Sequence, residues 1–375
     1  MKKLFILAAA AVAVLAACTK TEVVDNTPDK AITFQVANYT NQTKADSHGH
    51  TSLIDEGFNS FKTYAWYTPA SGTANQAFMA PATVEYDGTN KLWHATDRTY
   101  FWPKTGYVNF FSFAGSKLPT SVALDDTDSY KAKAKYEDQT IAIDDNILAA
   151  DGAYGFSSNP SASHGLDNVS EGVPTLFRHM LAKVKFDICV DAKNVTDDKN
   201  KWEVTVNSAV VKYRNVGTLD VTYPATPSIT FDADGHPTTA GTTDVFTAAW
   251  TPKNVANAEL TKVASVTPSA NGGEIGTAVP LIAESVVMPQ VLATTGVTIE
   301  LNYTITHTYD GSNAVVETVP ISAKALTAFA NAIDTWNRNT IYTYHIIIKP
   351  NGEILFDPAV EEWVEETTQP SYTIL

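Results

Sequence analysis

The chain has 375 residues, of which 41 are acidic and 26 are lysine or arginine, so its formal net charge is −15 at pH 7. Such an acidic surface repels phosphate groups, which argues against nucleic acid and anionic lipid faces as partners. The two cysteines, Cys18 and Cys189, are too few for a cysteine-based zinc site. The length is long for one domain and suits two.

The first 17 residues have the composition of an export signal. Lys2 and Lys3 precede an apolar run over residues 4–17, which is too short to span a membrane comfortably. Two alanines stand directly before Cys18, as in the signal of a bacterial lipoprotein. We therefore predict that residues 1–17 are a signal peptide and that Cys18 is the lipid-bearing first residue of the mature chain. The alternative is an ordinary signal peptide in which Cys18 carries no lipid.

Residues 18–44 are expected to form a polar leash followed by the first strand. Residues 31–36 alternate between apolar and polar side chains, which is typical of a strand with one buried face. The predicted buried face consists of Ile32, Phe34 and Val36. Residues 38–50 are almost wholly polar, and Lys44 is the only lysine or arginine between residues 31 and 61. We expect this stretch to be an exposed loop that proteases reach easily.

The rest of the sequence predicts a mostly β protein. Short runs of β-branched and aromatic residues lie between turn residues, which favours two consecutive antiparallel β-sandwich domains, at residues 45–174 and 175–375. Residues 151–174 are rich in glycine, serine and proline and are the candidate boundary or a long surface loop.

Three further stretches carry their own expectations. Residues 100–113 predict two strands around a turn, with the first strand ending at Pro103. The charged residues 125–139 predict a loop. Residues 323–336 are the one stretch in which apolar residues also fall at helical spacing, so a helix competes with strand there.

The sequence lacks the motifs of common enzyme sites. It contains no Walker loop, no H-E-x-x-H motif, no nucleophile elbow and no dinucleotide-binding fingerprint. His48 and His50 could bind a metal, but no obvious further ligands surround them, so a solvated loop is the better interpretation. Asp232 and Asp234 are spaced like the start of a calcium loop, but Thr243 stands where its final glutamate belongs. We expect no catalytic residue, metal or cofactor.

Acidic and aromatic residues offer two other possibilities. The acidic pairs at residues 125–126 and 144–145 could supply the carboxylates of a glycosidase, although solvated surface charge is the simpler interpretation. The seven tryptophans could form platforms for sugar stacking. Core packing is favoured for those in or beside apolar runs, namely Trp66, Trp102, Trp202 and Trp336.

Several segments, taken in order, resemble the fimbrillin family of Bacteroidales, whose polymerising members are called type V pilins. The resembling segments lie at residues 100–113, 146–150, 177–184, 288–290 and 336–363. The resemblance implies two transthyretin-like β-sandwiches, and export as a lipoprotein to the outer membrane and cell surface. It also implies a structural rather than enzymatic role, with other fimbrial subunits as partners.

The resemblance further implies a route of assembly. In polymerising members, a surface protease of the gingipain type cuts after arginine or lysine in the loop that follows the first strand. Removal of that strand opens a hydrophobic groove, which the extended C-terminal segment of another subunit fills. In this chain the cut would separate Lys44 from Ala45, and the alternating Tyr372 and Ile374 in the tail would form the donor strand.

Other outcomes stay open at this point. The best-known processing site of the family is an arginine, whereas this chain has Lys44. An uncut chain would remain on its lipid as an anchor or tip subunit, and the tail would then be a frayed terminus. From a different class, a surface glycan-binding lipoprotein would use the same leader with exposed tryptophans as its sugar platforms.

Overall fold

We describe the protein from a computed structural model. The described residues are 31–36, 51–69, 75–103, 106–124, 131–156, 172–223, 242–244, 246–312, 315–329, 332–351 and 354–363. Strands dominate these ranges, so the prediction of a mostly β protein is confirmed. Among the described residues, no helix is long and apolar enough to cross a membrane.

A ten-stranded sheet holds most of the N-terminal part of the chain. Its main path contains, in spatial order, β10 (Val173–Thr175), β1 (Thr33–Val36), β4 (Leu92–Ala95), β3 (Gln76–Asp87), β2 (Ser60–Thr68), β5 (Tyr107–Gly115), β8 (Ile147–Ala150) and β11 (Phe177–His179). Beside this path, β9 (Gly152–Phe156) pairs with β5 and with β15 (Thr242–Asp244).

Two sheets form the C-terminal lobe. The first contains β19 (Val279–Val287), β12 (Ala182–Val190), β24 (Thr340–Ile348) and β25 (Ile354–Glu362). The second contains β17 (Ala258–Thr261), β13 (Asn200–Tyr213), β21 (Thr298–Tyr309) and β22 (Val315–Ala325), with β18 (Ser269–Asn271) also paired to β13.

A four-stranded sheet lies between the lobes and takes strands from both halves of the sequence. It contains β16 (Thr247–Pro252), β14 (Val216–Thr222), β7 (Ala132–Thr140) and β6 (Ser121–Leu124). The remaining elements are the β20 (Gln290–Val291) and β23 (Thr335–Trp336) pair, the short helix α1 (Leu292–Thr295) and the 3-10 turn η1 (Leu326–Ala328). Since β7 precedes residue 174 and β14 follows it, the predicted division at that residue crosses one sheet, and the domain boundaries stay a prediction.

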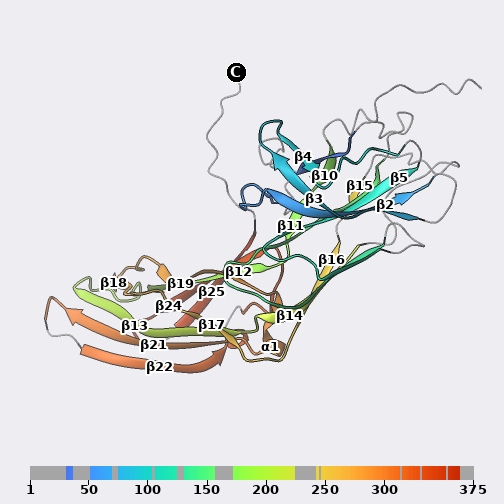
Figure 1. Cartoon of the computed structure of the whole chain (residues 1–375). Coiled ribbons are helices and arrows are strands. Elements are labelled where there is room, and N and C mark those ends of the chain that lie inside the picture. Colours follow the sequence, from blue (N-terminus) through green and yellow to red (C-terminus); the bar gives the residue numbers. More distant parts are fainter. Residues whose placement is uncertain are drawn as a thin grey trace, which may run out of the picture.

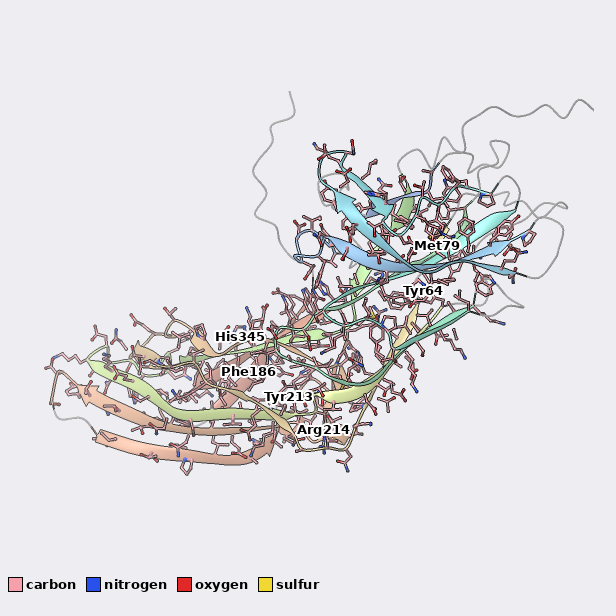
Figure 2. The ribbon with its side chains drawn as sticks, viewed as in Figure 1. Tyr64, Met79, Phe186, Tyr213, Arg214 and His345 are labelled. Carbon is pink, nitrogen blue, oxygen red and sulfur yellow. The ribbon has the colours of Figure 1, made fainter. Side chains whose placement is uncertain are left out.

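Figure 1 shows the resulting shape, with β2 to β5 in one lobe, β13, β21 and β22 in the other, and β14 and β16 between them. Three clusters of buried residues fill the molecule. One lies within the ten-stranded sheet, one between that sheet and the four-stranded sheet, and one between the two sheets of the C-terminal lobe. Met79 belongs to the first cluster, Tyr64 packs against the second, and Phe186 and Tyr213 belong to the third (Figure 2).

Two strand pairs differ from the predicted antiparallel arrangement. β1 pairs with β10 in parallel, and β12 pairs with β24 in parallel, whereas the other pairs of the described sheets are antiparallel. Parallel partners need a long connection, and in both cases the partner strand comes from far along the chain. Local sequence pattern predicts strands but not which distant strand they meet.

Two local expectations are wrong, and one stretch that is open between helix and strand forms strand and a 3-10 turn. The charged residues 125–139 contain most of β7, in which Ala132, Ala134 and Tyr136 are buried between exposed or half-buried charged residues. Two of the buried residues are alanines, which have low strand propensity, so the alternation did not predict a strand. Residues 100–103 form a single bridge at Phe101 rather than a strand. In 323–336, where helix and strand compete, the described residues form the end of β22, η1 and β23.

Candidate functional site

The first strand sits in a slot between two other strands. Phe34 is opposite Val173 on β10, in parallel, and opposite Trp93 on β4, in antiparallel register. The backbone N–H of Ile32 also donates to the carbonyl of Tyr100 at 2.8 Å. Because β1 has partners on both edges, its removal would leave a gap of about 10 Å between β10 and β4, which is the width of one missing strand.

The side chains of β1 fill the core of the N-terminal lobe as the alternation predicts. Ile32, Phe34 and Val36 are each less than 5% exposed, whereas Gln35 is exposed. The ring of Phe34 meets that of Phe61 edge-on, with centroids 5.5 Å apart. Burial of three such side chains contributes roughly 5–8 kcal/mol. Loss of the strand would therefore expose a strongly apolar slot.

Phe110 completes the surroundings of Phe34. The two ring centroids are 5.7 Å apart and the rings are perpendicular. Edge-to-face aromatic pairs add about 0.5–1.5 kcal/mol beyond the area that they bury. Since Phe110 lies on β5 and Phe61 on β2, the floor of the slot belongs to strands that remain when β1 is removed.

Gly172 allows β10 to run this close to β1. Its φ of +102° lies in the region that favours glycine. A Cβ atom there would be 2.8 Å from the carbonyl carbon of Phe34 and 2.9 Å from its nitrogen. Both conditions exclude larger residues, so Gly172 is part of the slot.

We expect Gly172→Ala to lower the free energy of unfolding by about 1–3 kcal/mol, through backbone strain and the clash with β1. Thermal unfolding of the uncut chain measures this loss. Gly311→Ala is the matched control, since Gly311 also has positive φ, at +71°, but no atom lies within 4 Å of its Cβ position. Equal losses in the two variants would contradict a specific contact with β1.

A second cluster of polar contacts connects Thr51, which follows the polar loop, to Trp363 near the end of the chain. The hydroxyl of Thr51 donates to Glu56 Oε1 at 2.8 Å, and Nδ2 of Asn146 donates to Glu56 Oε2 at 2.6 Å. Nε2 of His179 forms an ion pair with Glu56 Oε1 at 2.9 Å. The imidazole stacks on the ring of Trp363, with centroids 3.7 Å apart. We call these five residues the junction cluster.

The junction cluster orients the imidazole of His179. Because Asn146 donates from Nδ2 to Glu56, its Oδ1 faces Nδ1 of His179, 3.2 Å away. Nδ1 must therefore donate, while Nε2 faces a carboxylate oxygen. The contact of Nε2 with Glu56 is an ion pair by distance and lacks hydrogen-bond geometry. We assign the imidazolium form to His179 because it sets a cation beside the carboxylate, and this pair lies against Trp363. The ammonium of Lys183 lies on the same indole, 4.4 Å from its centroid.

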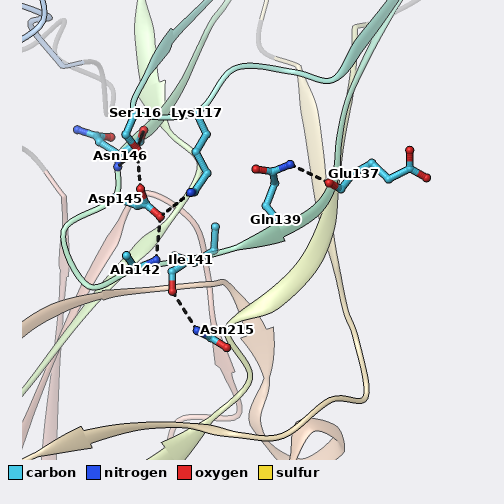
Figure 3. A network of polar contacts seen from close by, with 9 residues as sticks. All are labelled: Ser116, Lys117, Glu137, Gln139, Ile141, Ala142, Asp145, Asn146 and Asn215. Atoms are coloured by element: carbon cyan, nitrogen blue, oxygen red, sulfur yellow. Dashed lines mark hydrogen bonds and ion pairs between the residues drawn. The ribbon is translucent and has the colours of Figure 1, made fainter.

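Asp145, one member of the acidic pair at residues 144–145, has a structural role. Asp145 accepts from the backbone N–H of Ala142 and the hydroxyl of Ser116, both at 2.8 Å, and pairs with Lys117 at 3.1 Å (Figure 3). Burial alone would raise the pKa of Asp145, but these partners outweigh it and hold the pKa below its ordinary value. Asp145 thus ties a loop together and is not poised as a general acid.

The other predicted site residues fall in two groups. Ile32, Phe34 and Val36 lie together in the slot. The lipidation residue Cys18, the cleavage residues Lys44 and Ala45, and the donor residues Tyr372 and Ile374 lie outside the described residues, as do His48, His50, Asp125, Asp126, Asp232 and Asp234. The seven tryptophans are all described; Trp66 and Trp250 are half-buried and the rest are buried, so none forms an exposed platform.

Sequence reasoning missed Gly172 and the junction cluster. A glycine that marks close backbone contact looks like any other glycine in a polar loop. Glu56 and His179 are far apart in sequence, and a pair of that kind leaves no local signal. His179 stood out only as part of the segment 177–184 on which the family resemblance depends.

The fold is similar to that of solved fimbrial and adhesion proteins. A crystallised fimbrial protein from Bacteroides vulgatus matches with a TM-score of 0.55 and 14% identity, over 89% of this chain and 100% of that one. A candidate cell adhesion protein from Bacteroides uniformis matches with a TM-score of 0.39 and 16% identity, over 89% and 98% of the two chains. A search of curated proteins returned no match.

The family model described as fimbrillin-like matches residues 40–363, which is most of the chain. The chain therefore belongs to the fimbrillin-like family, as the resembling segments indicated. This family is one of structural and adhesion proteins at the cell surface and not of enzymes. Family membership also implies association with other fimbrial subunits.

Proposed function

We propose that this chain is a structural subunit of a surface fimbria that polymerises by strand exchange. In this proposal the precursor is exported and held in the outer membrane by lipid on Cys18. A surface protease cuts between Lys44 and Ala45, and β1 leaves with the leash. The tail of another subunit, with Tyr372 and Ile374 in alternation, then fills the slot.

The observation that supports this proposal is the seating of β1. The strand is short and is paired on both edges, and together with the preceding Ile32 it buries three apolar side chains. Its loss would leave unpaired backbone groups next to an apolar floor, which is a template for strand addition. A donor strand with alternating apolar residues would restore both kinds of contact.

Limited trypsin treatment of the unlipidated protein tests the cut. Trypsin cleaves after lysine and arginine, and Lys44 is the only such residue between residues 31 and 61. We expect a new N-terminus at Ala45, followed by a ladder of oligomers on sizing. Lys44→Gln should abolish both products, whereas Lys349→Gln should leave both unchanged. A different terminus, or a cut chain that stays monomeric, would sink the proposal.

An uncut anchor or tip subunit is the second candidate. It uses the same slot with β1 kept permanently, and the lysine at position 44 in place of arginine favours it. Sizing after digestion separates the two candidates, since a chain that serves as an uncut subunit would give no ladder of oligomers after trypsin cleavage at Lys44. The alternative of a glycan-binding lipoprotein with exposed tryptophan platforms is not supported, because all seven tryptophans are buried or half-buried.

A further inference from the structure

A groove of about 760 Å³ lies where the four-stranded sheet meets the C-terminal lobe. Its lining includes Arg178, Trp250, Thr294, Thr295, Arg338 and Thr340. These residues come from β11, β16, the short helix α1, the turn before β24, and β24 itself. The volume falls within the range of about 300–1,000 Å³ that is usual for small-molecule sites.

Two arginines of the groove, Arg178 and Arg338, share the charge of one buried carboxylate, that of Asp151. Arg178 is neutralised, because its Nε and Nη2 donate to the two carboxylate oxygens of Asp151 at 2.8 and 3.0 Å. The guanidinium of Arg338 instead lies over the ring of Phe246, 4.9 Å from its centroid, and forms no ion pair with any described residue. Glu361, the one acid among the lining residues, is exposed.

The environment of Arg338 is costly for a cation. Burial, and next the nearby charge of Arg178, lower the pKa of Arg338 from its ordinary value; the charge of Asp151 opposes this shift, and arginine remains charged. Arg338 is half-buried, and one carboxylate between two guanidiniums leaves one positive charge that an anion with matching hydrogen bonds would compensate. The chemistry of the groove thus calls for an anionic group from outside the described chain.

The neutral side chains of the groove require donors from a ligand. The hydroxyls of Thr294 and Thr295 both donate to the carbonyl of Val291, at 3.0 and 2.8 Å. The hydroxyl of Thr340 donates to the carbonyl of Arg338 at 3.0 Å. Their hydrogens are committed, so the oxygens offer acceptors to the groove.

Trp250 adds a flat apolar surface. Its Nε1 already donates to the carbonyl of Met180 at 2.8 Å, so the half-buried indole offers its ring rather than its N–H. We propose that this groove binds a carboxylated sugar, with the carboxylate on Arg338, ring hydroxyls on the threonine oxygens and the C–H face of the sugar on Trp250. The proposal is independent of any cut after Lys44.

Titration calorimetry with sodium glucuronate tests the proposal on the chain from Thr19 to its end. We expect saturable binding that weakens as salt is added, and at least about tenfold weaker binding of glucose, because one charge-assisted guanidinium contact is lost. N-acetyl-glutamyl-glycine serves as the peptide carboxylate for comparison. Tighter binding of this dipeptide than of glucuronate would overturn the sugar assignment.

Two substitutions localise the site. Arg338→Gln should weaken glucuronate binding about tenfold or more. Arg98→Gln is the matched control, since Arg98 also lies over an aromatic ring, that of Tyr100 at 4.4 Å, but outside the groove. Thr340→Val keeps the shape of the side chain and should reduce affinity severalfold, which preserves a readout if Arg338→Gln fails to fold. The site would be refuted if the chain bound no glucuronate, or if Arg338→Gln and Arg98→Gln lost the same amount of glucuronate affinity.

Discussion

Phe34→Ala is expected to lower the free energy of unfolding of the uncut chain by about 3–5 kcal/mol. The ring is 2% exposed and packs edge-on against Phe61 and Phe110, so its removal leaves a cavity whose rigid aromatic walls collapse poorly. Denaturant unfolding, followed by tryptophan fluorescence, measures the loss. Gln35→Ala, on the exposed face of the same strand, should change stability by less than about 0.5 kcal/mol.

The same substitution also tells whether β1 leaves after cleavage. If the strand is discarded, cut subunits made from the wild type and from Phe34→Ala contain the same residues and should be equally stable. A deficit that persists in the cut variant would show that β1 remains in the slot. In that case the donor strand would need a different acceptor, and strand exchange at this position would be refuted.

His179→Ala should destabilise the chain by about 3–5 kcal/mol, because it leaves the carboxylate of Glu56 buried without its cationic partner. His179 is 0% exposed, and Glu56 keeps only the neutral donors Thr51 and Asn146. His345→Ala is the control. That imidazole is partly exposed and 3.9 Å from Asp187, so its loss should cost less than about 1 kcal/mol (Figure 2).

A double-mutant cycle separates the ion pair from the stacking on Trp363. Glu56→Gln removes the charge that His179 opposes, so the loss caused by His179→Ala should be smaller in that background, by about 0.5–3 kcal/mol. Additive losses, measured by denaturant unfolding of the four proteins, would mean that the ring acts through stacking alone. The charged state that we assign to His179 would then be wrong.

The residues that sequence reasoning placed correctly share one property, a strong local pattern. Ile32, Phe34 and Val36 alternate with polar neighbours, and large apolar side chains make that period plain. In β7 the same period exists, but two of its buried residues are alanines, so its charged neighbours dominated the prediction. Hydrophobic periodicity thus predicts a strand in proportion to the size of its buried side chains.

Other features depend on pairings between distant segments. The parallel contacts of β1 with β10 and of β12 with β24, and the Glu56–His179 pair, each join residues that nothing local connects. The groove around Arg338 is a further example, because its lining comes from five separate stretches of the chain. Which charged and hydrogen-bonding groups lie together in such a groove can be seen only in the folded chain.

The parallel pairing of β1 with β10 also bears on the order of folding. β2 pairs in antiparallel fashion with β3 and β5, which lie near it in the sequence. Phe34 pairs with Val173, which is much farther along the chain. Contacts of high sequence separation form late because a long loop must close first. The pairing of β1 with β10 would therefore form last and complete a sheet whose antiparallel pairs are already built. A strand that arrives last in this way can also depart while the pairings that preceded it remain intact.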